Sequence, residues 1–133
     1  MDNKSKKILS EISPGELLDK LSILEIKLTK IKDKKNLLEI NKEYESLNET
    51  KKLNINITDE LKNLISEIKK INLKLWNIED DIRTCEKNKD FGEKFIDLAR
   101  SVYLNNDKRS EIKLKINKIL NSNIKEIKHY VDY

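Results

Sequence analysis

One stretch of the chain, from Leu61 to Cys85, carries apolar residues at alternating steps of three and four. These apolar positions are Leu61, Leu64, Ile68, Ile71, Leu75, Ile78, Ile82 and Cys85. Such a heptad seam is typical of a long helix laid against another helix. At ~1.5 Å per residue the seam is roughly 36 Å long. Because burial of so long an apolar stripe drives association, other helices must cover it.

Composition places the rest of the chain in the same class. The 133 residues include two glycines and one proline, too few for a sheet with many hairpin turns. Charged residues make up 39% of the chain, yet the apolar residues are periodic, which favours a packed helical protein over disorder. We therefore predict an all-α protein, with a flexible N-terminus over residues 1–12 and a single helical domain over residues 13–133.

The first helix is predicted to begin at Ser13, because Glu16 follows three residues later as in a capping box. An apolar stripe runs through residues 17–31 at steps of four and three. A second stripe, over residues 37–47, is offset from the first. Either a stutter or a short break is therefore expected within residues 33–36.

Polar segments are predicted to separate the later helices. Residues 48–56 are rich in Asn and Thr and are expected to form a turn before Thr58 caps the helix with the seam. A capping-box pattern over residues 90–93 opens a third helix. Residues 105–107, Asn-Asn-Asp, are expected to form a turn or a cap before a fourth helix. The tail over residues 124–131 has helical apolar spacing and is expected to dock on the bundle.

The two long segments, residues 13–47 and 58–85, predict an antiparallel helical hairpin resembling a coiled coil, with two shorter helices packed on it as a helical bundle. Its wide apolar faces would remain partly exposed. A homodimer with twofold symmetry would cover them, so we expect a dimer.

The distribution of charge and the lack of targeting signals limit the classes of partner and the location that we expect. The net charge of +4 comes from 28 basic and 24 acidic residues that are mixed along the chain, whereas a nucleic-acid surface needs clustered basic residues with aromatic residues between them. Nucleic acid is therefore not an expected partner. Without a signal-peptide core or a long apolar run, we expect a cytoplasmic protein with no membrane segment. The single cysteine, Cys85, lies on the seam and is expected to be a core residue.

Arginine use singles out one region. Three arginines stand against 25 lysines, and all three lie within residues 76–109, together with the only tryptophan. The planar guanidinium pairs with carboxylates or phosphates in a way that lysine cannot copy. Charged and aromatic residues at helical spacing around these arginines define a charged network or ligand site: Glu16, Asp19, Lys20, Trp76, Glu79, Asp80, Arg83, Arg100, Tyr103, Asp107 and Arg109.

Two interpretations of this network stay open. It forms either a structural ion-pair network that fixes helix register or a site for an anion or a metal phosphate. The structural interpretation predicts that Arg83 and Arg100 are partly buried and paired with acids of other helices. The candidate acids are Glu16, Asp19, Glu79 and Asp80.

Three blocks of the sequence resemble a known family. They are SPGELLDKLSILEIK at 13–27, LWNIEDDIR at 75–83 and FIDLARSVYLNNDKR at 95–109. They are similar to a family of small, all-helical bacterial and phage-borne proteins of unknown function. The resemblance covers nearly the whole chain, and it implies no activity.

The functional hypothesis is a non-enzymatic helical protein that acts as a dimer and binds an unknown protein or a small anionic ligand, without a cofactor. The alternative is a magnesium-dependent nucleotide or phosphate hydrolase of the all-α type, in which Glu16, Asp19, Glu79 and Asp80 would hold the ion. His129 is the only histidine, so the ligand sets of zinc and di-iron sites are absent from the sequence. No catalytic residue is assigned.

Overall fold

A computed structural model describes residues 4–133. Within that range the regular secondary structure consists of helices, with no strand. The helices are α1 (Pro14–Lys30), α2 (Lys34–Asn54), α3 (Asp59–Lys87) and α4 (Glu93–Ile119). The predicted all-α class is confirmed. None of these four helices is both long enough and apolar enough to cross a bilayer.

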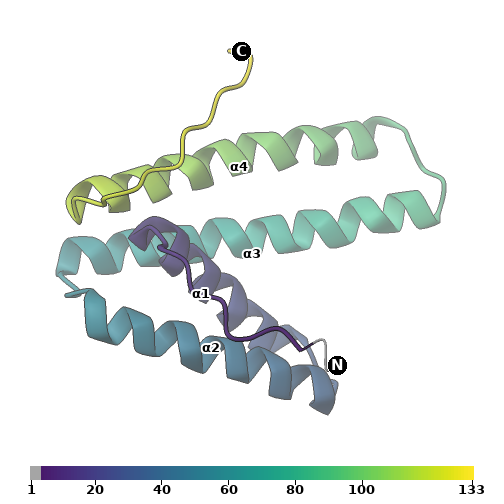
Figure 1. Ribbon diagram of the computed structural model, residues 1–133. Coiled ribbons are helices and arrows are strands. Elements are labelled where there is room, and N and C mark those ends of the chain that lie inside the picture. The colour runs from purple at the N-terminus through teal and green to yellow at the C-terminus, as the bar shows by residue number, and fades with distance from the viewer. Residues whose placement is uncertain (1–3) are drawn as a thin grey trace.

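The long antiparallel hairpin is formed by α3 and α4; α1 packs on one end of it, and α2 packs on α1 (Figure 1). A hairpin with two shorter helices was predicted, but with residues 13–47, and not α4, as the partner of α3. The segment expected to pair with α3, residues 13–47, is divided between α1 and α2. A short break, not a stutter, separates them: Ile31 is extended, and Asp33 caps α2 by accepting from the Asn36 N–H at 3.3 Å.

The apolar seam of α3 is confirmed as core. Leu61 and Ile68 are 0% exposed, and Ile71 and Ile82 are half-buried. α1 contacts each of the other three helices. The central cluster of buried residues joins α1, α3 and α4 and consists of Leu17, Leu18, Leu21, Leu61, Leu64, Ile68, Ile112 and Ile116. α1 thus holds the bundle together at the end where three helices meet.

Two predicted helix starts are confirmed by their caps. Ser13 Oγ accepts from the Glu16 N–H and Thr58 Oγ1 accepts from the Leu61 N–H, each at 3.2 Å. The capping box predicted at residues 90–93 is wrong. Gly92 occupies the cap of α4 without a side-chain bond, while Asp90 Oδ1 accepts from the Gly92 N–H at 3.2 Å in the turn before it.

Of the two predicted turns, one is shorter than expected and the other is helical. α2 continues through residues 48–54 of the first to Asn54, whose Nδ2 donates to the Thr50 carbonyl at 2.8 Å, and residues 55–58 connect α2 to α3. α4 passes through residues 105–107 without a break, and Asn105 Nδ2 donates to the Ser101 carbonyl at 2.8 Å. Side chains of this kind satisfy carbonyls one turn earlier and so let Asn and Thr sit inside helices.

The two ends of the chain are less regular. The tail after α4 is not helical, and Ile127 and Val131 are exposed, although Tyr133 returns to contact Tyr103 edge-on at 5.6 Å. Residues 4–12 have no regular secondary structure, and residues 1–3 of the predicted flexible terminus lie outside the described range. The flexible terminus, the single-domain boundary and coiled-coil geometry stay predictions.

Candidate functional site

The start of α1 is held against α4 by a glycine. The Gly15 N–H donates to Asn117 Oδ1 at 2.8 Å, and both residues are buried. A Cβ atom on Gly15 would lie 2.6 Å from the Lys113 carbonyl oxygen and 2.8 Å from Asn117 Oδ1. Only glycine fits this contact without displacing backbone. The contact fixes where the next turn of α1, with Glu16 and Asp19, meets α4.

Asp19 is the centre of a buried polar network. Its side chain is 0% exposed and forms a bidentate pair with Arg109 of α4, at 2.9 Å from Nε to Oδ1 and 2.5 Å from Nη2 to Oδ2. From α3, Asn72 Nδ2 donates to Asp19 Oδ1 at 2.8 Å and to Ser22 Oγ at 2.7 Å. The bond to Asp19 raises the pKa of Arg109 above its ordinary value, although burial opposes the shift. Three helices therefore meet on one paired carboxylate.

Lys113 extends the network toward the tail. Its Nζ lies 2.6 Å from Glu16 Oε2 and 3.8 Å from Asp19 Oδ2, and 3.4 Å from Glu126 Oε2 after α4. Lys128 pairs with Glu126 at 2.9 Å. The bond to Lys128, with Lys113 adding its charge, lowers the pKa of Glu126. Glu16 and Asp19 are thus both matched to cations of α4.

The network predicted from the sequence is only partly brought together. Asp19, Glu16 and Arg109 meet as described. The expected placement of Arg83 is wrong: its side chain is 71% exposed and pairs with Glu79 one turn away on the same helix. Arg100 is also exposed, and within residues 4–133 it forms no ion pair with an acid of another helix. No third helix covers the part of α3 and α4 where these two arginines lie (Figure 1).

The remaining predicted residues lie on the surface or at its edge. Lys20 and Asp80 are exposed, and Trp76 is half-buried. Tyr103 and Asp107 both contact the tail, because Tyr133 meets the first edge-on and donates its hydroxyl to the second. Asp107 also lines a hollow of about 400 Å³ together with Glu16, Arg109 and Lys113, so it lies beside the network without forming an ion pair in the described chain.

Beside the Asp19 network, α1, α3 and α4 enclose a hollow of about 450 Å³, which we name the three-helix groove. It is lined by Ile23 and Ile26 of α1, by Asn72, Leu75, Trp76, Glu79, Asp80 and Arg83 of α3, and by Asn106 and Arg109 of α4. Five of these residues belong to the site predicted from the sequence: Trp76, Glu79, Asp80, Arg83 and Arg109. The lining combines apolar and polar side chains, as in many ligand pockets.

Asn72 is the functional candidate that sequence reasoning missed. It is 5% exposed and lines the groove. Its amide nitrogen is used twice, whereas its Oδ1 accepts no hydrogen bond within residues 4–133. Since no fully buried side-chain oxygen of the described chain lacks a partner, Asn72 Oδ1 keeps some accessible surface, and it belongs to a residue that lines the groove. Extending the Trp76–Asp80 stripe one turn toward the N-terminus would have found it.

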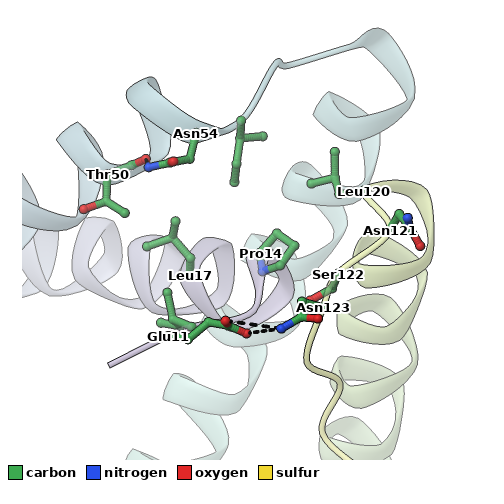
Figure 2. Close-up of a pocket in the computed structure, with 11 residues that line it drawn as sticks. Glu11, Pro14, Leu17, Thr50, Asn54, Leu120, Asn121, Ser122 and Asn123 are labelled. Atoms are coloured by element: carbon green, nitrogen blue, oxygen red, sulfur yellow. Dashed lines mark hydrogen bonds between the residues drawn. The ribbon is translucent and has the colours of Figure 1, made fainter. Parts of the chain in front are cut away.

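A second hollow, of about 390 Å³, lies between the start of α1, the end of α2 and the turn after α4. Figure 2 shows Leu17, Pro14 and Leu120 around it and the bonds from Asn123 to Glu11 along its edge. It contains none of the residues predicted to form a site, so the three-helix groove is the better candidate.

The chemistry of the groove is set by which charges are already paired. Arg109 is committed to Asp19 and Arg83 to Glu79. Within residues 4–133 there is no group of three or more His, Cys, Asp or Glu side chains arranged to hold a metal ion. The groove therefore offers an aromatic wall and hydrogen-bond acceptors, on a frame held by a buried ion pair.

Comparison with known proteins gives a family and no activity. No curated protein and no solved structure matches the chain. The predicted resemblance to a family of unknown function is confirmed, while an origin in bacteria or phages stays a prediction. The model of the family described as "Family of unknown function (DUF6165)" matches residues 8–132, and the chain belongs to that family.

Proposed function

We propose that this chain is a non-enzymatic helical binding protein and that the three-helix groove is its binding site. One observation carries the proposal. The buried Asp19–Arg109 pair fixes the three helices around the groove, while Trp76, Asp80 and Asn72 Oδ1 are left free at its surface. A rigid frame that presents unused groups in a concave surface is what selective binding requires.

The experiment places a photo-crosslinking amino acid at position 83, an exposed position of the groove lining, and, as a control, at Glu67, an exposed position of α3 outside the groove. In source cells we expect a discrete adduct from position 83 only. The purified partner should then bind the unmodified protein and lose affinity for Trp76→Ala. Equal adducts from both positions, or a partner indifferent to Trp76→Ala, would contradict the proposal.

The same preparations test the hydrolase alternative. A binding protein releases no phosphate from nucleoside triphosphates in the presence of magnesium. Magnesium-dependent phosphate release that disappears in Glu16→Gln would establish hydrolysis instead. Glu16 is one of the four acids expected to hold the ion, and it shares Lys113 of α4 with Asp19.

We further propose that the protein acts as a homodimer in the cytoplasm, paired through α4. Arg100, Tyr103, Leu104 and Asp107 lie on one face of α4, which no other helix covers within the described chain; Tyr133 of the tail contacts Tyr103 and Asp107 at its edge and would have to share or leave this face in the dimer. Tyr103 and Leu104 are 45% and 37% exposed. A twofold axis near them would place Arg100 of one copy opposite Asp107 of the other, so the face is complementary to itself.

A charge-reversal pair tests this dimer by light scattering. Arg100→Asp and Asp107→Arg should each give monomers of 15.7 kDa, and the double variant should recover the dimer. Arg83→Asp, an exposed arginine on α3, is the matched control and should stay dimeric. A monomeric unmodified protein at high concentration would rule the dimer out.

A further inference from the structure

Two side-chain acceptors are left free in the three-helix groove, beside two donors, Trp76 Nε1 and Asn106 Nδ2, that make no hydrogen bond within residues 4–133. The Asp80 carboxylate forms no ion pair within residues 4–133, and only the backbone carbonyl of Asp80 is engaged, by Thr84 Oγ1 at 3.0 Å. Asn72 Oδ1 is also unused, as shown above. Both groups are acceptors. Asn72 is almost completely buried, so an empty acceptor there is costly unless a ligand or water fills it.

The cations of the groove are already neutralised. The largely buried Arg109 is paired with Asp19, and the exposed Arg83 is paired with Glu79. With these two pairs set aside, Asp80 is the one lining charge that has no partner in the described chain. An anionic ligand would have to compete with Asp19 or Glu79 for these cations, and it would meet one repelling carboxylate. The groove therefore suits a donor with positive charge, contrary to the small anion expected from the sequence.

The position of Trp76 gives the shape of that donor. On α3 it lies one turn after Asn72 and one turn before Asp80, so its indole lies between the two acceptors. A guanidinium stacks on an indole face and donates through a planar fork to a carboxylate. Ile23 and Ile26 opposite offer an apolar surface for a methylene stem.

We infer that the three-helix groove receives an arginine side chain of a partner polypeptide. Its guanidinium stacks on Trp76 and pairs with Asp80, and a backbone N–H of the partner donates to Asn72 Oδ1. The two acceptors are separated by two helical turns, about 12 Å along α3, which exceeds the reach of one guanidinium and favours a peptide over a free cation. This inference rests on the proposed function.

The test uses N-acetyl-arginine amide as the probe, with N-acetyl-citrulline amide as its neutral isostere and N-acetyl-glutamate amide as an anion. Trp76 is the only tryptophan, so its fluorescence reports on the groove. We expect a saturable change with the arginine probe and at least about fivefold weaker binding of the citrulline probe, about 1 kcal/mol. Asp80→Asn should weaken arginine binding as much, and Asp81→Asn, an exposed neighbour outside the groove lining, should leave it unchanged.

Equal binding of arginine and citrulline, an equal effect of Asp81→Asn, or tighter binding of the glutamate probe would overturn the inference. So would the absence of any saturable change. The proposed function fails separately, when the cross-linker at position 83, which leaves Asp80 intact, gives no groove-dependent partner. If a partner captured from position 83 still binds after all its contacting arginines are replaced by citrulline, the binding function stands and the inferred arginine contact is refuted.

Discussion

Two regions of this molecule place an arginine next to an acid, and only one of them buries the pair. At the junction where α1 crosses α3 and α4, Arg109 is 27% exposed and holds the fully buried Asp19 of another helix. In the arm, where α3 and α4 continue from the crossing toward their connecting turn, Arg83 lies at the open rim of the three-helix groove, is 71% exposed and holds Glu79 of its own helix. The difference shows that coverage by the third helix, α1, and not the presence of an arginine, determines whether the ion pair is buried.

The physical reason is the exclusion of water. A carboxylate taken out of water must be paired and fully hydrogen-bonded, and removing its partner costs ~3–5 kcal/mol. An exposed pair one turn apart on a helix contributes only ~0–1 kcal/mol. At the junction α1 removes the water, and its Asp19 carboxylate meets donors from α3 and α4. In the arm the solvent competes for both charges, so pairing there has little effect on stability.

The largest contrast between junction and arm is expected for a buried charge. Ile68→Asp, at a position that is 0% exposed, should abolish cooperative unfolding, because an unpaired carboxylate in the core costs several kcal/mol of a total stability of ~5–15 kcal/mol. Phe91→Asp at the tip of the arm, where the residue is 49% exposed, should cost no more than ~1.5 kcal/mol. Circular dichroism in urea compares them. A normal transition for Ile68→Asp would show that the seam is not core.

A smaller contrast separates the two glycines, each at the start of a helix. Gly15→Ala should cost ~1–3 kcal/mol, because its Cβ would meet the Lys113 carbonyl at 2.6 Å. Gly92→Ala has only Asp90 Oδ1 at 3.4 Å nearby and should change stability by less than ~0.5 kcal/mol. Urea midpoints measure both. Equal midpoints for the two variants would mean that α1 does not approach α4 this closely.

The smallest effect concerns the tail, which pairs with Lys113 at the junction and reaches Tyr103 beyond it. The bond to Asp107 raises the pKa of Tyr133 to about 12. The raised pKa means that this contact stabilises the fold below pH ~10 and is lost as the pH rises through about 12. Absorbance titration of the protein minus that of Tyr133→Phe isolates this tyrosine. A difference curve centred near pH 10 would show that the tail does not dock there.

Much of the fold could be predicted from local sequence patterns. The heptad steps from Leu61 to Cys85 predicted the core face of α3, and Ser13 and Thr58 predicted two helix starts, because caps and periodicity depend on neighbours in sequence. Asn105 predicted a turn wrongly, since its side chain bonds back to Ser101 inside α4.

The site was predicted less well, because it depends on a crossing. Rarity marked all three arginines equally, and nothing in the stripes of α3 and α4 shows how far along them α1 lies. That position follows from Gly15, whose missing side chain lets α1 touch the α4 backbone. Asn72 and Lys113 were missed for the same reason: their partners, Asp19 and Glu16, are contributed by α1.

The central claim, that α1 turns a common surface motif into a buried interhelical pair, is tested most directly by two double-mutant cycles in urea. One cycle combines Asp19→Ala with Arg109→Ala, and the other combines Glu79→Ala with Arg83→Ala. We predict a coupling energy above ~1.5 kcal/mol for the first pair and below ~0.5 kcal/mol for the second. Equal couplings in the two cycles, or a larger one for Glu79 and Arg83, would contradict the account.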